Sequence, residues 1–259
     1  MRIQTPCVRS LFDSELATLM KTLILIPARF ASTRYPGKPL VDIAGKSLLK
    51  RVWERCIPVL GKEKVFVATD DQRIVDHCEE HGMQWVMTPD TCLTGTDRLA
   101  AAAEKLEADL YINVQGDEPM IHPDDIKKVI DLAEKNPGEV LNAYCAIETE
   151  LDYSSRTVPK VVFRPDGRLL YMSRAPIPGD KLSTFVRANK QVCIYAFPPQ
   201  ALRDYSSKSL KTPLEGLEDI EILRFLELGY EVRMVEVSGS SIAVDTPEDV
   251  ERVLKVLEA

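Results

Sequence analysis

The sequence predicts an α/β fold: a mostly parallel central sheet with helices on both faces and an inserted β-rich subregion. Up to about residue 140, short apolar runs that end in polar loops alternate with helical patterns. Strand-like runs then follow one another with few helices between them, before helical patterns return near the C-terminus. The chain has 259 residues, no internal repeat and no Gly/Ser-rich linker, so we expect one domain over residues 21–259.

The first half of the chain shows the strand–loop–helix alternation most clearly. We expect a strand at Thr22–Ile26, a β-rich apolar run that Pro27 closes. A polar loop then leads to a helix over Ser47–Leu60, which is apolar along one side. The aspartates of Thr69–Asp71 are well placed to cap a second helix that runs to Gly82. The other elements expected here are the strands Lys64–Ala68, Gln84–Met87 and Leu110–Val114 and the helix Asp97–Leu106.

The second half is richer in strands. Residues Phe163–Arg168 form a predicted hairpin turn, because their Asp-Gly pair suits a tight turn. We expect a helix over Leu217–Leu228 that ends at Gly229, and a last helix with Thr246 as N-cap and Pro247 in its first turn. The expected strands are Leu141–Ile147, Lys160–Phe163, Leu169–Met172, Val192–Phe197, Glu231–Val237 and the strand-like Ser241–Val244.

Composition and charge narrow the classes of function. Subtracting 40 acidic from 33 basic residues leaves a net charge of −7, which disfavours nucleic acid as a partner. No apolar run approaches the roughly 20 residues that span a bilayer, so we expect no membrane partner. The six cysteines are scattered without a C-x-x-C pair, which favours a reducing, cytoplasmic location. Residues 1–20 lack a continuous apolar core and are interpreted as an N-terminal extension, not a signal peptide.

The loop after the first strand is the strongest candidate for a phosphate site. It holds Arg29, Arg34 and Lys38, with Gly37 among them, and loops that follow the strands of an open α/β sheet carry its ligands. The alternative is a solvated basic loop, and we favour the phosphate site. A second phosphate motif, the GKS that begins at Gly45, lacks the earlier glycine of a P-loop, and no G-x-G-x-x-G fingerprint occurs.

Two isolated carboxylates follow strand-like runs. Asp117 comes directly after LYINV, and Asp245 follows SIAV. Together they could hold Mg²⁺, a hard cation that takes carboxylate and phosphate oxygens. The alternative readings are a turn residue for Asp117 and a helix cap for Asp245. With the basic loop nearby, we favour a metal–polyphosphate site.

Two other patterns are weaker. His77 and His81 have the spacing of a zinc pair, but Cys78 stands where H-E-x-x-H needs its glutamate, so a polar helix face is favoured. Residues Thr94–Arg98 could bind a nucleotide through hydroxyls and backbone N–H groups, and on spacing alone a helix cap is favoured.

Taken together, the loop motifs resemble the 3-deoxy-manno-octulosonate (Kdo) cytidylyltransferase family. The resemblance runs in order from about Lys21 to the C-terminus, and its first loop and QGDEP segment are highly specific. It is carried by PARFASTRYPGKPL (27–40), VATDD (67–71), TGTDRLA (94–100), NVQGDEPMI (113–121), YMSRAPIP (171–178), PLEGLEDIEILR (213–224) and VDTPED (244–249).

The resemblance implies a single Rossmann-like nucleotidyltransferase domain that forms a homodimer through the inserted β-rich region. It implies the Mg²⁺-dependent reaction CTP + Kdo → CMP-Kdo + pyrophosphate, in lipopolysaccharide biosynthesis. Lys38, Asp117 and Asp245 would be catalytic, with the two aspartates as Mg²⁺ ligands. The nucleotide would be bound by Arg29, Lys38, Thr94, Gly95, Thr96 and Arg98. The sugar would be bound by Arg34, Gln115, Arg174, Gln191, Tyr195 and Glu221, with Arg174 or Arg34 on its carboxylate.

Two departures from the family pattern concern the sugar. Gln191 stands where the family commonly has His, and Ile222 where it commonly has Gln. A pocket that lost a polar contact discriminates the matching hydroxyl less well. The same chemistry on 8-amino-Kdo or a nonulosonic acid is therefore an alternative, and a non-catalytic nucleotide-binding module is another. A glycosyltransferase is disfavoured because no Asp-x-Asp follows LYINV.

Overall fold

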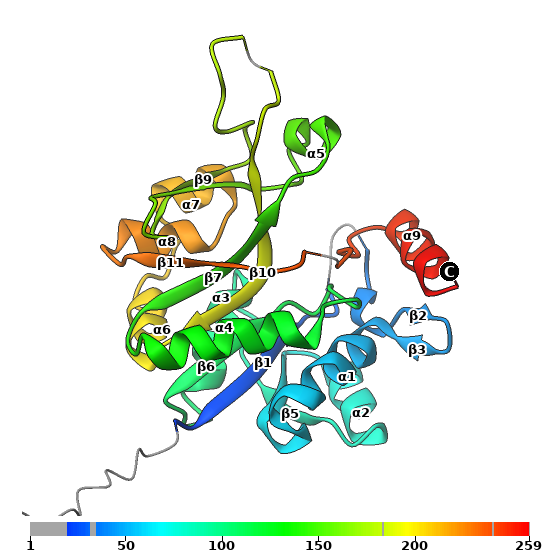
Figure 1. Ribbon diagram of the computed structural model, residues 1–259. Coiled ribbons are helices and arrows are strands. Elements are labelled where there is room, and N and C mark those ends of the chain that lie inside the picture. Colours follow the sequence, from blue (N-terminus) through cyan, green and yellow to red (C-terminus); the bar gives the residue numbers. More distant parts are fainter. Residues whose placement is uncertain (1–19, 32–34, 183, 240, 259) are drawn as a thin grey trace, which may run out of the picture.

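The computed structural model describes residues 20–31, 35–182, 184–239 and 241–258. Most of the proposed extension and Arg34 therefore lie outside the described residues. A nine-stranded mixed sheet forms the centre (Figure 1). Its main path runs in the order β11 (Val232–Glu236), β7 (Val140–Ala146), β10 (Asn189–Phe197), β6 (Leu110–Val114), β1 (Thr22–Ala28), β4 (Val65–Thr69) and β5 (Gln84–Met87).

The strands of this path are parallel except for one. β1 pairs in parallel with β4 and β6, β4 with β5, and β7 with β11, whereas β10 is antiparallel to both of its neighbours in the path, β6 and β7. A hairpin of β8 (Lys160–Phe163) and β9 (Leu169–Ser173) joins the sheet through β10. The α/β fold class is confirmed, with β10 as the reversed strand that the sequence does not reveal.

Helices cover both faces of the sheet because alternate residues of each strand point to opposite sides. Ile24 and Ile26 of β1 pack in one core, and Leu23 and Leu25 pack in the other. The first core is covered by α1 (Leu48–Leu60), α2 (Gln72–Glu80) and α4 (Pro123–Lys135), and the second by α3 (Gly95–Ala103), α6 (Pro199–Ser206) and α8 (Ile222–Glu227).

The C-terminal helix α9 (Pro247–Leu257) packs beside the hairpin of β2 (Asp42–Ile43) and β3 (Lys46–Ser47), as Figure 1 shows. Residues 174–182 and 184–188 project as an arm between β9 and β10, at the top of Figure 1. The arm packs on α5 (Glu150–Ser154), where the Tyr153 and Phe185 rings lie 5.1 Å apart. The short 3-10 turns are Lys38–Leu40 and Lys62–Lys64.

Several predicted element ends are confirmed by their capping contacts. Ser47 and Asp71 accept the capping hydrogen bonds of α1 and α2. Thr94 caps α3, which begins two residues earlier than expected, and Thr246 forms a capping box at α9 with Pro247 in the first turn. No helix in the described residues is long and apolar enough to cross a membrane.

Two predicted elements are wrong. The continuous helix expected over 217–228 is two helices, α7 (Pro213–Glu218) and α8, separated at Asp219, whose φ is 53°. The guanidinium of Arg174 accounts for the break: it donates to the Glu218 and Asp219 carbonyls at 2.6 and 2.9 Å, which a continuous helix would use in its next turn. The run Ser241–Val244 has no regular secondary structure and is a loop, not a strand.

Candidate active site

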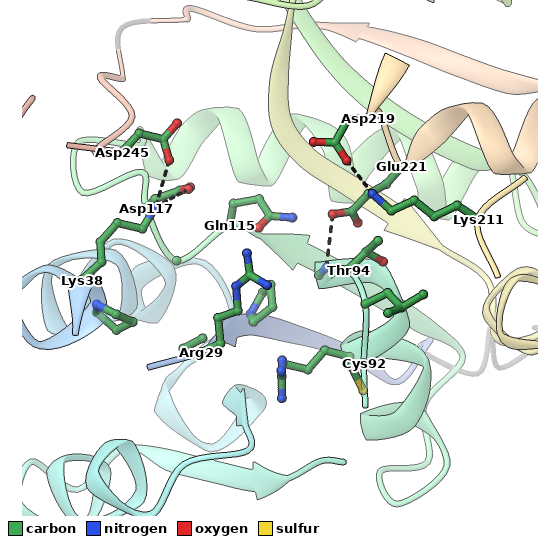
Figure 2. Close-up of a pocket in the computed structure, with 17 residues that line it drawn as sticks. Arg29, Lys38, Cys92, Thr94, Gln115, Asp117, Lys211, Asp219, Glu221 and Asp245 are labelled. Carbon is green, nitrogen blue, oxygen red and sulfur yellow. Dashed lines mark hydrogen bonds and ion pairs between the residues drawn. The ribbon is translucent and has the colours of Figure 1, made fainter. Parts of the chain in front are cut away.

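An open cavity of about 280 Å³ lies where loops leave the carboxyl ends of β1 and β6 (Figure 2). Because β1 and β6 are parallel neighbours, the polar residues after them meet at one edge of the sheet. The cavity is lined by Pro27, Ala28, Arg29, Lys38, Pro39, Cys92, Leu93, Thr94, Gly95, Arg98, Gln115, Gly116, Asp117, Lys211, Asp219, Glu221 and Asp245.

At one end of the cavity, Lys38 holds two carboxylates together. Its Nζ donates to Asp117 Oδ2 at 3.0 Å and to Asp245 Oδ1 at 3.1 Å. Gly37 starts the turn that presents Lys38, with φ of 74° and its N–H on the Phe30 carbonyl at 2.9 Å. The Val244 N–H donates to the Asp117 carbonyl at 2.9 Å, so a backbone contact brings Asp245 beside Asp117 from 128 residues along the chain.

The electrostatics of this end favour a bound cation. Burial lowers the pKa of Lys38, but the two carboxylates outweigh it and hold that pKa above its ordinary value, so the ammonium stays charged. One ammonium between two carboxylates leaves a net negative charge. Next to them, burial and the Asp117 carboxylate raise the pKa of Glu118 to about 7.

The donor set at this end fits a hard divalent cation. Asp117 and Asp245 offer carboxylate oxygens around one point, which the Lys38 ammonium marks. In the described part of the chain no three His, Cys, Asp or Glu side chains form a metal cluster. Mg²⁺ suits two carboxylates, because it keeps several waters and completes its shell with substrate phosphate oxygens.

The opposite wall is built on the N-terminus of α3. The Glu221 carboxylate accepts the Gly95 and Thr96 N–H groups at 3.1 and 2.7 Å and the Thr96 hydroxyl at 2.5 Å. Burial raises the pKa of Glu221, although these hydrogen bonds oppose the rise. Figure 2 shows Gln115 between this wall and the Lys38 cluster, and a Cβ on Gly95 would lie 3.0 Å from Gln115 Nε2.

Buried ion pairs hold the start of α3 in place. Arg98, only 3 % exposed, donates to Asp70 at 2.8 Å and to the Thr88 hydroxyl at 2.6 Å. Behind it, the buried Arg224 donates to Asp97 at 3.1 Å and to both carboxylate oxygens of Glu215. A cavity wall fixed in this way is preorganised to orient a ligand.

Comparison with known proteins decides the class of this molecule. The family profile described as cytidylyltransferase matches residues 23–236, most of the chain. The chain belongs to the cytidylyltransferase family. It is therefore a nucleotidyltransferase, and the resemblance read from its loop motifs is confirmed.

Individual relatives agree with that class. A 3-deoxy-manno-octulosonate cytidylyltransferase of Escherichia coli is 38% identical over 235 residues, 91% of this chain and 95% of that relative. An 8-amino-3,8-dideoxy-manno-octulosonate cytidylyltransferase of Shewanella halifaxensis is 39% identical over 236 residues, 89% of this chain and 96% of that relative. A solved CMP:2-keto-3-deoxy-manno-octonic acid synthetase complexed with CTP matches with a TM-score of 0.85 and 38% identity, covering 92% of this chain and 98% of that one.

The cytidylyltransferase cavity brings together most of the residues expected to bind nucleotide or metal. Those that line it are Arg29, Lys38, Thr94, Gly95, Arg98, Asp117 and Asp245, together with the expected sugar ligands Gln115 and Glu221. Thr96 lies just behind the wall and is bonded to Glu221.

Three expected sugar ligands are not part of the cavity lining. Arg174 donates through its guanidinium to three backbone carbonyls. Gln191 donates to the buried Asn142 amide oxygen at 2.9 Å, and Tyr195 packs in the core beneath the sheet face. Arg34 lies outside the described residues.

Cys92, Lys211 and Asp219 also line the cavity, although the sequence analysis did not name them as site residues. Lys211 Nζ lies 2.5 Å from Asp219 Oδ1 beside Glu221 (Figure 2). Asp219 lies within the PLEGLEDIEILR motif, two residues before Glu221, and this position could have marked it as a candidate site residue. Lys211 precedes the motif, and nothing in its local sequence distinguishes it from a surface lysine.

His77 and His81 lie at the C-terminal end of α2, away from the residues that line the cavity. The His77 Nε2 lies 2.7 Å from the Ser47 hydroxyl, His81 is the C-cap of α2, and the described residues hold no third ligand around them.

Proposed function

We propose that this cytidylyltransferase transfers the cytidylyl group of CTP to the anomeric hydroxyl of Kdo, giving CMP-Kdo and pyrophosphate. The observation that carries the proposal is the convergence of Lys38, Asp117 and Asp245 at one end of the cavity. The opposite wall, formed by Glu221 and the start of α3, is polar and leaves room for a sugar. Relatives named for Kdo and for 8-amino-3,8-dideoxy-manno-octulosonate support an octulosonic acid as the acceptor.

The phosphate end supplies charge neutralisation. Asp117 and Asp245 would hold Mg²⁺, which when bound polarises the α-phosphate and lowers the pKa of the attacking hydroxyl. Lys38 and Arg29 both line the cavity and offset the negative charge that develops toward the leaving pyrophosphate. The hydroxyl attacks the α-phosphorus in line, so the remaining task of the protein is to position both substrates.

The opposite wall orients the substrates. Thr94 and Gly95 present the start of α3 to the nucleotide, and Gln115 lies between the nucleotide and acceptor sides. Glu221 is already bound to Gly95 and Thr96, so it fixes this wall and offers its remaining acceptor capacity to the sugar. Arg174 acts through position, because it holds the turn that carries Asp219 toward the cavity.

The proposal extends to the oligomeric state, the pathway and the location of the enzyme. A homodimer would bury the arm and α5, where Leu151, Leu182 and Val186 expose 78–81 % of their surface. The product would feed lipopolysaccharide biosynthesis. The cytoplasmic location stays a prediction that rests on the scattered cysteines.

Pyrophosphate release tests the proposal. The assay contains CTP and Mg²⁺ with Kdo, 8-amino-Kdo or N-acetylneuraminate, and a control without acceptor. We expect release with an octulosonic acid, and a loss of at least about a hundredfold in kcat for Asp117→Asn and Lys38→Met. Lys46→Met, which removes an exposed lysine paired with Glu54, is the matched control and keeps wild-type turnover. Binding of CTP without pyrophosphate release in the presence of any of these acceptors would instead favour an untested sugar or a nucleotide-binding module.

A further inference from the structure

The acceptor of the proposed reaction is an acid, so its carboxylate needs a cation in the cavity. Among the described residues that line the cavity, the cations are Arg29, Lys38, Arg98 and Lys211. Lys38 is held by two carboxylates at the phosphate end, and Arg98 is buried in its ion pair with Asp70. Arg29 follows β1 directly, and the proposed function assigns it to the CTP phosphates.

The family resemblance suggests Arg174 or Arg34 as the partner of the sugar carboxylate; Arg34 lies outside the described residues, and the guanidinium of Arg174 is bound to backbone carbonyls. Its Nε, Nη1 and Nη2 donate to the carbonyls of Glu218, Arg156 and Asp219 at 2.6, 3.1 and 2.9 Å. Its backbone N–H donates to the Glu218 carboxylate at 2.9 Å. Turning this guanidinium toward a substrate would leave three carbonyls without their donor, which is costly at a partly buried site.

Lys211 lines the cavity beside Glu221, directly before the N-cap of α7 (Figure 2). The next residue, Thr212, is the N-cap of α7 and forms a capping box with the buried Glu215. Asp219 ends the same helix in a left-handed conformation. The two residues thus project from opposite ends of one fixed short helix, and their side chains meet over the cavity (Figure 2).

The contact between Lys211 and Asp219 can open at little cost. The Lys211 side chain is 31 % exposed and that of Asp219 is 70 % exposed, so water readily takes over the carboxylate. An anion arriving from the cavity would then meet a preorganised ammonium. A compact, strongly hydrated ammonium suits a single carboxylate oxygen.

We propose that Lys211 binds the carboxylate of the acceptor sugar acid, and that Asp219 holds the ammonium at the cavity until the acceptor arrives. This inference rests on the proposed function, and it assigns to Lys211 a role in choosing an α-keto sugar acid over neutral sugars. Asp219 is a positioning residue in this scheme.

The test compares Lys211→Met with wild type on two acceptors, Kdo and its methyl ester, in the CTP-dependent pyrophosphate assay. Wild type should prefer the acid over the ester in kcat/KM, because a hydrogen bond to a charged group is lost with the ester. Lys211→Met should lose about tenfold or more in kcat/KM for the acid, little for the ester, and shift the KM for CTP less than about twofold. Lys211→Arg should restore most of the preference.

Lys208→Met is the matched control, because Lys208 is an exposed lysine three residues earlier in the chain. A Lys211→Met variant that keeps the wild-type preference for acid over ester overturns the inference, as does a loss confined to CTP. A wild-type enzyme that releases no pyrophosphate with any sugar acid counts against the proposed function instead, so the two failures are distinguishable.

Discussion

A side chain added at Gly95 should disturb Gln115 and so lower the activity of the enzyme without unfolding it. Gly95 is the first residue of α3, and its φ lies outside the left-handed region, so its backbone accepts any residue. A Cβ there would lie 3.0 Å from Gln115 Nε2, 3.4 Å from Gln115 Oε1 and 3.5 Å from Glu221 Oε1. In Gly95→Ala the end of the Gln115 side chain therefore has to move by a few tenths of an ångström.

The effects on stability and on activity separate. Alanine in place of glycine stabilises by about 0.4–1 kcal/mol through the unfolded chain, and displacing one flexible side chain costs about 0.5–1.5 kcal/mol. The free energy of unfolding should thus change by less than about 1 kcal/mol. Loss of a neutral hydrogen bond from Gln115 to substrate costs about 0.5–1.5 kcal/mol, which is about a two- to twelvefold loss in kcat/KM.

The assay is pyrophosphate release under varied acceptor, with urea unfolding in parallel. A double-mutant cycle with Gln115→Ala tests the cause: Gly95→Ala should have little further effect in that background. Gly116→Ala is the contrasting control, because its Cβ would lie 2.8 Å from the Pro27 carbonyl oxygen, a backbone atom that does not yield, and it should lose about 1–3 kcal/mol of stability. An equal activity loss from Gly95→Ala with and without Gln115 would refute the reasoning.

Two predictions concern stability away from the cavity. Hydrogen bonds from Arg233, opposed by burial, lower the pKa of Glu139, so its stabilisation is complete above the unfolded value near 4.3 and is lost as pH falls through the folded value. Glu139→Gln should cost about 1 kcal/mol in urea unfolding at pH 7 and progressively less as the pH falls through the folded value, and a cost that does not change with pH would contradict the ion-pair explanation. Arg224→Met leaves the buried Glu215 carboxylate uncompensated and should cost about 3–5 kcal/mol at pH 7. Arg252→Met, at a side chain 64 % exposed, is its control and should cost less than about 0.5 kcal/mol.

The parts of the fold that local chemistry determines could be predicted from the sequence. The run LYINV becomes β6 with all five residues buried, and the capping positions Asp71, Thr94 and Thr246 are as expected. The direction of β10 was out of reach, because an apolar run has the same pattern whether its neighbour is parallel or antiparallel. The register of β10 with β6 depends on contacts about 80 residues apart in the sequence.

The candidate site divides in the same way. That the loops after β1 and β6 meet is a consequence of parallel pairing, and it places Lys38 beside Asp117. Asp245 is brought close by a different kind of contact: the Val244 N–H, in a loop that is not a strand, donates to the Asp117 carbonyl. Asp245 was thus correctly expected beside Asp117, although the residues before it form a loop and not the expected strand.

The break between α7 and α8 depends on contacts that the local sequence does not reveal. In a continuous helix, the Glu218 and Asp219 carbonyls would accept N–H groups from the following turn. Arg174 supplies those donors from another part of the chain, and the helix can therefore turn at Asp219. After the turn, Asp219 lies at the cavity in contact with Lys211, and Glu221 accepts the Gly95 N–H at the start of α3. Arg174, which the resemblance assigns to the sugar, thus holds the turn that brings Asp219 to the cavity. Lys211, which we propose for the acceptor carboxylate, belongs to none of the motifs that carry the resemblance.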